Sequence, residues 1–134
     1  MAANVIVDAG FLVTLLSRRE ADHKWADRQA LKYPPPWRTC DAVLSEAFHL
    51  LDSTDVLSAL IRRGAVTSGF DFNETASVVL ALMDKYSDVP MSFADACLVR
   101  MTEMLSDPLV LTTDGDFRIY RRNGRQVVPC VLPR

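Results

Sequence analysis

The stretch Asn4-Val5-Ile6-Val7-Asp8-Ala9-Gly10 decides the fold. Its first four residues are a short, nearly all-apolar run, which predicts a strand buried on both faces, as in a parallel sheet. The run ends at Asp8, so the predicted strand carries an acid at its carboxyl end. Ligands of open α/β sheets bind at the carboxyl ends of the strands. Asp8 is therefore a candidate functional residue.

The rest of the chain alternates such apolar runs with helical patterns. Further strands are predicted at Trp37–Cys40, Leu109–Thr112 and Val127–Leu132, with a loop or strand at Phe70–Phe72. Helices are predicted at residues 11–16, 22–31, 41–51, 53–63, 73–86 and 92–105. Strands separated by helices imply a mostly parallel α/β sheet with helices on both faces. No linker, repeat or low-complexity tract divides the chain, which predicts one domain over residues 1–134.

The composition is that of a globular domain with a hydrophobic core. The 134 residues are 49% hydrophobic and 24% charged, which excludes a disordered or fibrous protein. The longest apolar run, Val78–Met83, is far shorter than the roughly 20 residues of a membrane-spanning helix. We therefore expect no membrane-spanning segment and no membrane partner.

The cysteines and the start of the chain indicate a cytoplasmic protein. Cys40, Cys97 and Cys130 are odd in number and widely separated, which favours reduced thiols over a disulfide framework or a zinc site. The apolar stretch Ala9–Leu16 follows an acid, and no Lys or Arg precedes it, so it lacks the flank of a secretion signal.

Several carboxylates lie in apolar sequence. Asp114 follows the predicted strand at 109–112, as Asp8 follows the first strand, so both acids are expected at the same edge of the sheet. Glu46 and Asp95 lie in predicted helices, and neither has a Lys or Arg three or four residues away. Burying unpaired carboxylates is costly, and clustering them raises their pKa values. A divalent cation removes both costs, and oxygen-only ligands favour Mg²⁺ or Mn²⁺.

Each acid also has a structural explanation. Asp8 could close a strand-to-helix turn, and Glu46 could point outward from a helix edge. Asp95 stands three residues after Ser92, which is the spacing of a capping box. The acids within 114–116 could be turn residues. None of these explanations accounts for the apolar sequence around every acid, or for two acids at strand ends on one edge.

Four segments of the chain form a recognisable set in this order: Val7–Val13, Leu44–Leu51, Ser92–Ala96 and Thr112–Phe117. Together they resemble the PIN-domain family, and more narrowly the VapC-type toxin ribonucleases of bacterial toxin–antitoxin modules. The resemblance runs from about Asn4 to Leu132. It implies a five-stranded parallel sheet in the order 3-2-1-4-5, with a Mg²⁺- or Mn²⁺-dependent endoribonuclease site at its carboxyl edge.

The resemblance also implies roles for individual residues. The family's acidic quartet of catalytic and metal-binding residues matches Asp8, Glu46, Asp95 and Asp114. Of these, Asp8 and Asp95 would be the most direct metal ligands. Asp116 matches an auxiliary acid found in part of the family, and Thr112 occupies the hydroxyl position beside the acids. The activity so implied is metal-assisted hydrolysis of RNA that leaves 5′-phosphate and 3′-hydroxyl ends.

The implied partners are RNA, a small antitoxin protein and a second copy of the chain in a homodimer. In the family, an apolar surface of the first helix receives an antitoxin segment. Here that helix carries Phe11, Leu12, Leu15 and Leu16. Packing in the core explains the same residues and is the default interpretation.

The last part of the chain is basic. No acid follows Asp116, whereas five arginines do: Arg118, Arg121, Arg122, Arg125 and Arg134. Guanidinium groups pair well with phosphate, and Tyr120 could stack on an unpaired base, which predicts RNA binding by the first four of these arginines. A solvated basic edge is the alternative. The net charge of −2, from 15 basic and 17 acidic residues, is then a sum of two opposite local charges.

Three other functions fit parts of the pattern. The first is a PIN-domain nuclease of RNA processing or decay without a toxin role, and the second is a non-catalytic RNA-binding module. The third is a phosphotransfer domain, because an Asp at a strand end also serves aspartyl-phosphate chemistry. That third function lacks a Lys near the last strands and leaves Glu46 and Asp95 without a role.

Overall fold

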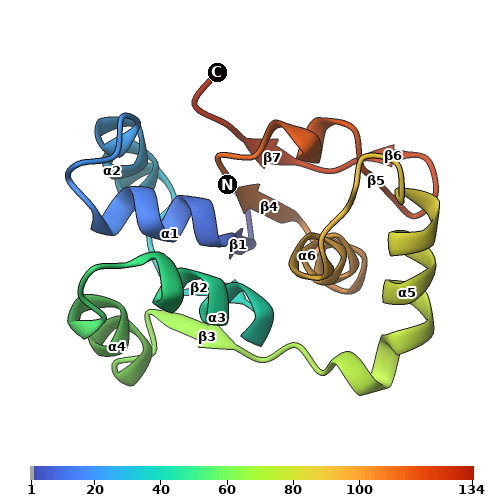
Figure 1. The fold of residues 1–134 in the computed structure, drawn as a ribbon, viewed down its shortest axis with the longest axis horizontal. Coiled ribbons are helices and arrows are strands. Elements are labelled where there is room, and N and C mark those ends of the chain that lie inside the picture. The colour runs from blue at the N-terminus through green and yellow to red at the C-terminus, as the bar shows by residue number, and fades with distance from the viewer. Residues whose placement is uncertain (1) are drawn as a thin grey trace.

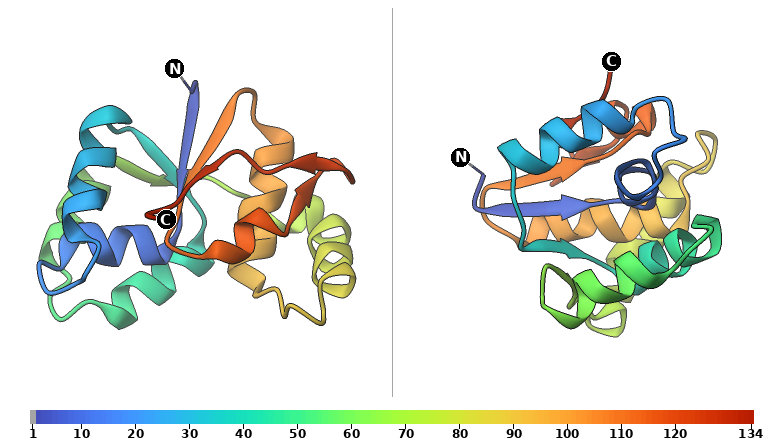
Figure 2. Two further views of the ribbon diagram at one scale, coloured as in Figure 1. Left: turned by 90° about the horizontal axis from the view of Figure 1, so that it is seen from above. Right: turned by 90° about the vertical axis from the view of Figure 1, so that its left-hand side faces the viewer.

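A five-stranded parallel sheet forms the centre of the computed structural model, which describes residues 2–134. Its strands are β1 (Asn4–Val7), β2 (Trp37–Thr39), β3 (Val66–Ser68), β4 (Pro108–Leu111) and β7 (Cys130–Val131). They lie in the order β3-β2-β1-β4-β7, and every neighbouring pair is parallel. Figure 2 shows β2, β1 and β4 as teal, blue and orange arrows that point the same way. The predicted order 3-2-1-4-5 is confirmed, with β7 as the fifth strand.

The central strand is the apolar run with which the chain begins. Val5, Ile6 and Val7 are buried, and Ile6 pairs with residues of β2 on one side and β4 on the other. A strand with a hydrogen-bonded neighbour on each edge and helices over each face has no solvated side, so its residues are apolar throughout.

In the described part of the chain, six α-helices cover the sheet. They are α1 (Ala9–Leu16), α2 (His23–Lys32), α3 (Asp41–Leu50), α4 (Asp55–Arg62), α5 (Ala76–Lys85) and α6 (Phe93–Met104). The pair α1 and α2 lies on one side of the sheet, and the pair α5 and α6 on the other (Figure 1), as predicted. None of the helices within residues 2–134 has the length and hydropathy needed to span a membrane.

The apolar residues of α1 mostly face the core. Phe11 is fully buried, and its ring packs edge-on against Trp25 and Trp37, with centroids 5.9 and 5.5 Å away. Leu12 is fully buried as well, so neither side chain contributes to a docking surface. Of the four apolar residues of this helix that the resemblance associates with an antitoxin, only Leu15 and Leu16 are partly exposed.

The segment 70–72, predicted as a loop or strand, is a loop that leads into a short 3₁₀ helix, η1 (Phe72–Thr75). β3 ends at Ser68, and the Asp71 carboxylate caps η1 by accepting a hydrogen bond from the Asn73 N–H at 3.0 Å. One predicted strand was placed wrongly. The strand expected over 127–132 is divided. Its first residue, Val127, belongs to β6 (Gln126–Val127), which pairs antiparallel with β5 (Arg121–Arg122). Only β7, after Pro129, joins the main sheet.

Candidate active site

The first acid of the site is held by both of its oxygens. Asp8 directly follows β1 and is the N-cap of α1, where its Oδ1 accepts a hydrogen bond from the Phe11 N–H at 2.8 Å. Its Oδ2 accepts a hydrogen bond from the Thr112 hydroxyl, which comes from the end of β4. The Asp8 side chain is only 6% exposed. The strand-to-helix turn considered for Asp8 is therefore present, and it places the carboxylate at the carboxyl edge of the sheet.

A chain of hydrogen bonds organises the acids that follow β4. The buried Thr112 hydroxyl accepts from the Asp114 N–H at 2.9 Å. Asp114 in turn caps the 3₁₀ helix η2 (Gly115–Arg118), because its Oδ1 accepts from the Asp116 N–H at 2.9 Å. Thr112 thus fixes Asp8 and the turn that carries Asp114 at the same time.

Asp95 is positioned by the start of α6 and by a buried tyrosine. Ser92 is the N-cap of α6 and accepts from the Asp95 N–H at 3.0 Å, so the predicted cap is present. The Tyr120 hydroxyl donates to Asp95 Oδ2 at 3.0 Å. Tyr120 is fully buried and packs edge-on against Tyr86 and Phe117, which fixes its ring.

One cavity of about 340 Å³ collects the five predicted acids, and we call it the acidic cavity. The acids that line it are Asp8, Glu46, Asp95, Asp114 and Asp116. Glu46, on α3, is exposed, while Asp114 and Asp116 are half-buried. Thr112 lies behind Asp8 instead of lining the cavity. Of the described residues that line the cavity, none is Lys, Arg or His.

A glycine lets α1 approach the end of β4 closely at this cavity. A Cβ added to Gly10 would lie 2.2 Å from the hydroxyl oxygen of Thr113 and 3.5 Å from Asp8 Oδ1. Any other residue at position 10 would therefore displace the Thr113 side chain on the cavity wall. The glycine keeps space open where the two acidic strand ends meet.

Burial and mutual repulsion perturb two of the carboxyls. Burial raises the pKa of Asp8 from 3.8 to about 7, the charges of Asp95 and Asp114 add to this rise, and the bonds from Thr112 and Phe11 oppose it. The pKa of Asp95 is raised from 3.8 to about 6, mainly by burial. Tyr120 counteracts that rise, and its own pKa is raised by burial and by the charge of Asp95.

The donor set fits a hard divalent cation. The polar groups that line the cavity are carboxylates and hydroxyls without a basic partner, and the raised pKa values of Asp8 and Asp95 report mainly the cost of burying a charged carboxylate there. Within residues 2–134, no group of three or more His, Cys, Asp and Glu side chains already stands in an arrangement that could hold a metal ion. A cation here would therefore be held by few side chains and by retained waters, as is common for Mg²⁺.

The basic segment makes internal contacts that the sequence did not indicate. Arg121 Nη1 donates to the carbonyls of Arg118, Ile119 and Tyr120 at 2.8, 3.2 and 2.9 Å. Arg122 donates to the Thr102 carbonyl and to Gln126 Oε1. These bonds give both guanidinium groups a structural role.

The remaining arginines differ in their contacts, and Tyr120 between them is buried. Arg118 donates to the Arg134 carbonyl, and Arg134 pairs with Asp22 at 3.0 Å. Arg125 is exposed. RNA binding by this segment stays a prediction. The prediction that Tyr120 stacks on a base is wrong, because its ring is fully buried.

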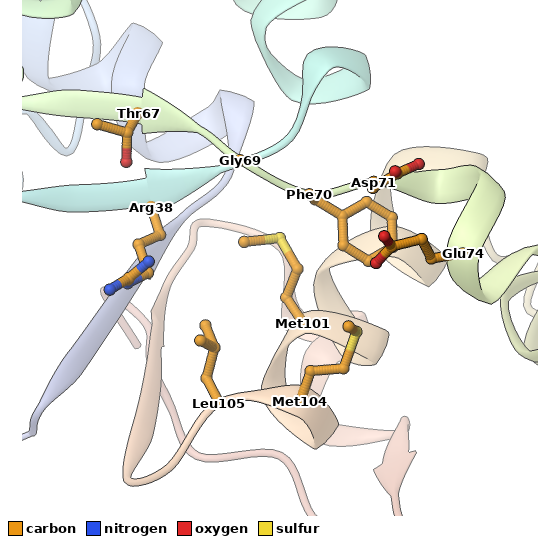
Figure 3. A pocket seen from close by; sticks show the side chains of 9 residues that line it. All are labelled: Arg38, Thr67, Gly69, Phe70, Asp71, Glu74, Met101, Met104 and Leu105. Atoms are coloured by element: carbon orange, nitrogen blue, oxygen red, sulfur yellow. The ribbon is translucent and has the colours of Figure 1, made fainter.

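A separate cavity of about 140 Å³ lies toward the other end of α6 (Figure 3). Met101, Met104 and Leu105 point from the end of that helix toward the segment that carries Phe70, and Arg38 of β2 borders the cavity. None of the predicted site residues lines it. This cavity therefore takes no part in the predicted site.

Fold and site together define an α/β protein whose carboxylates converge at the carboxyl edge of a parallel sheet, in a cavity suited to a divalent cation. Residues 5–123 match the model of the PIN domain, and the chain belongs to that family. It shares its fold with VapC20 of Mycobacterium tuberculosis, a sarcin–ricin-loop-cleaving toxin, with a TM-score of 0.72 and 22% identity over 84% of this chain and 92% of that one. Comparison with curated proteins gave no match.

Proposed function

We propose that the chain is a Mg²⁺- or Mn²⁺-dependent endoribonuclease and acts as the toxin of a type II toxin–antitoxin module. The observation that carries the proposal is the meeting of Asp8, Asp95 and Asp114 in one cavity that lacks a basic partner. Membership of the PIN-domain family and the fold shared with a toxin that cleaves the sarcin–ricin loop support it.

In this proposal, Asp8 and Asp95 hold the cation, with Asp114 beside them. The bound cation supplies Lewis-acid activation of water and neutralises charge at the scissile phosphate. Thr112 and the Phe11 N–H fix the two oxygens of Asp8, so its carboxylate cannot rotate away from the cavity. A carboxylate held in this way needs little reorganisation when substrate arrives.

Glu46 has a different role in this proposal. Glu46 is the one acid of the five that is exposed, so solvent reaches it while it lines the cavity. There it can accept a proton from an attacking water. Tyr120 donates to Asp95 Oδ2 and keeps that carboxylate oriented.

The test is cleavage of single-stranded RNA by the purified protein in Mg²⁺ or Mn²⁺, with EDTA and a DNA strand of the same sequence as comparisons. We expect cleavage of the RNA that EDTA abolishes, and products with 5′-phosphate ends. Full activity in EDTA, or products with 2′,3′-cyclic phosphates, would contradict the proposal. Asp84→Asn is a matched control, because Asp84 is an exposed acid on α5 outside the acidic cavity.

The toxin role has a separate test. Production of the protein in a bacterial host should arrest growth, and production of Asp95→Asn should not. Co-production of a small protein encoded next to the gene should restore growth and yield a stable complex. Cleavage in vitro without growth arrest would favour a nuclease of RNA processing or decay instead.

Tyr120→Phe is expected to lower cleavage about tenfold, the usual cost of losing a residue that orients a metal ligand. Because the lost hydrogen bond favours ionised Asp95, the pKa of Asp95 should rise and the acidic limb of the pH–rate profile should move to higher pH. Tyr86→Phe is the matched control. It removes a neighbouring buried hydroxyl that bonds to the Arg121 N–H and to no carboxylate. An unchanged profile for Tyr120→Phe would exclude this positioning role.

A further inference from the structure

A second cavity, of about 380 Å³, lies at the same edge of the sheet, where β2 and β3 end. It is bordered by the segment 68–73 and by the first turns of α3 and α6, and we call it the aromatic cavity. It adjoins the acidic cavity, because the same two helices serve both. Residues 41–42 and Phe93 line the aromatic cavity, while Val43 and Ser92 line the acidic one. A strand bound at the acidic cavity would therefore reach the aromatic cavity with a neighbouring nucleotide.

A fixed, partly exposed aromatic ring lines the aromatic cavity, and its two chain neighbours line the acidic cavity. Phe93, the first residue of α6, is 40% exposed although it is a large apolar side chain. Phe72 packs edge-on against it, with ring centroids 5.1 Å apart and an interplanar angle of 76°. This contact restrains the Phe93 ring without covering it. Exposed aromatic rings are the platforms on which unpaired bases stack.

The polar groups of the aromatic cavity are suited to a ligand that donates hydrogen bonds. The Asp41 carboxylate accepts from the Ser68 hydroxyl, and Asp71 Oδ1 accepts from the Asn73 N–H at 3.0 Å, which leaves the second oxygen of each acid available. Within residues 2–134 the Asn73 side-chain amide has no hydrogen-bond partner. It is exposed and lines the cavity.

The charge of the aromatic cavity excludes some ligands. No Lys or Arg is among the described residues that line it, whereas two carboxylates are. A phosphate or an acidic peptide would be repelled there. An uncharged, planar group with N–H donors meets both the ring and the carboxylates favourably.

We propose that the aromatic cavity binds an unpaired nucleobase of the RNA whose backbone lies at the acidic cavity, with preference for bases that carry an exocyclic amino group. The proposal rests on the proposed function. Guanine presents an amino group beside a ring N–H, which matches a carboxylate, and adenine and cytosine each present one amino group. Uracil has no amino group, and its ring N–H lies between two carbonyl oxygens that the carboxylates repel, so it is disfavoured. Phe93 supplies the stacking surface, and Asn73 contacts the edge of the base.

The first experiment measures base binding without cleavage. Guanosine, adenosine, cytidine and uridine, which carry no phosphate, are titrated into the metal-free protein and followed by NMR. We expect the Asn73 side-chain amide and the Phe93 ring signals to shift most with guanosine and least with uridine. Phe93→Ala should weaken guanosine binding on the order of tenfold. Leu80→Ala, which truncates another half-exposed apolar residue, should not.

The second experiment measures base preference during cleavage. Wild-type protein is given random-sequence single-stranded RNA in Mg²⁺, and the product ends are sequenced. We expect a preference for amino-bearing bases at one position relative to the cleaved bond. Phe93→Ala and Asn73→Ala should flatten it, with a melting temperature that shows the variants to be folded. A preference that survives in both folded variants would overturn the proposal.

The two experiments separate this proposal from the proposed function. Nucleoside binding at Asn73 and Phe93 without any RNA cleavage would support the base site and contradict the nuclease. RNA cleavage without nucleoside-induced shifts would support the nuclease and contradict the base site. Argininamide, titrated as a third probe, tests a basic protein side chain. Shifts with argininamide and none with nucleosides would overturn the base site in favour of a protein ligand.

Discussion

Asp8→Asn is expected to lower Mg²⁺-dependent RNA cleavage on the order of 10³-fold while the protein stays folded. Asp8 is the most deeply buried acid of the acidic cavity, and both of its oxygens are fixed by hydrogen bonds. The amide keeps the shape of the side chain but removes the negative charge that would hold the cation. A cation contributes several kcal/mol of charge stabilisation, and each 1.4 kcal/mol is about tenfold in rate.

Two further variants show whether the loss belongs to Asp8 itself. Asp84→Asn removes one exposed acid from α5 and should leave cleavage within about twofold, because surface substitutions have little effect. Glu46→Gln should cost less than Asp8→Asn, since Glu46 is exposed and no hydrogen bond from a described residue fixes its carboxylate. Rates are measured with substrate in excess at pH 8. Retention of more than a tenth of the wild-type rate by Asp8→Asn would refute its assignment as a metal ligand.

The strand-end acids could be predicted from sequence because their signal is local. An apolar run of strand length followed by Asp, as at Val7-Asp8, fixes both the strand and the place of the acid within the sheet. Since parallel strands end at one edge, Asp8 and Asp114 had to lie near each other. The capping of α6 by Ser92 is equally local.

The tyrosine that holds Asp95 could not be predicted in the same way. The hydrogen bond from Tyr120 to Asp95 joins residues 25 positions apart, one just after η2 and the other in α6. No spacing rule relates them. A tyrosine among arginines has the same sequence pattern whether its ring is exposed or, as here, fully buried.

In the basic segment, too, the sequence does not reveal which side chains face solvent. Its composition favours phosphate contacts, but whether a guanidinium faces solvent depends on the turn that the chain makes. Arg121 folds back onto three carbonyls, those of the last residue of η2 and of the two residues after it, and Arg122 reaches Thr102 of α6. Carbonyls at a helix end lack intrahelical partners, and Arg side chains commonly satisfy them. In the folded chain, Arg121 and Arg122, which the sequence predicted to bind RNA, therefore bind backbone carbonyls of the protein itself.

The metal-free protein is expected to lose stability as the pH rises from about 4 to about 8. The pKa of Asp8 is raised in the folded state, from 3.8 to about 7, so the folded protein binds more protons than the unfolded chain between these values. The stability that neutral Asp8 contributes is complete below pH 3.8 and is lost as the pH rises through 7. Asp95, with its pKa raised to about 6, acts in the same direction.

Asp8→Asn isolates this contribution, because the amide stays neutral at every pH. In EDTA at pH 8, the variant should melt more than about 5 °C above the wild type, since each pKa unit is worth about 1.4 kcal/mol. At pH 4 the difference should nearly vanish, leaving only the altered hydrogen bond to Thr112. Mg²⁺ should raise the melting temperature of the wild type at pH 8 by binding ionised Asp8, and should raise that of the variant much less. Equal melting temperatures for the two proteins in EDTA at pH 8 would mean that Asp8 carries no unfavourable charge. Its place in the cavity would then need another explanation than a cation.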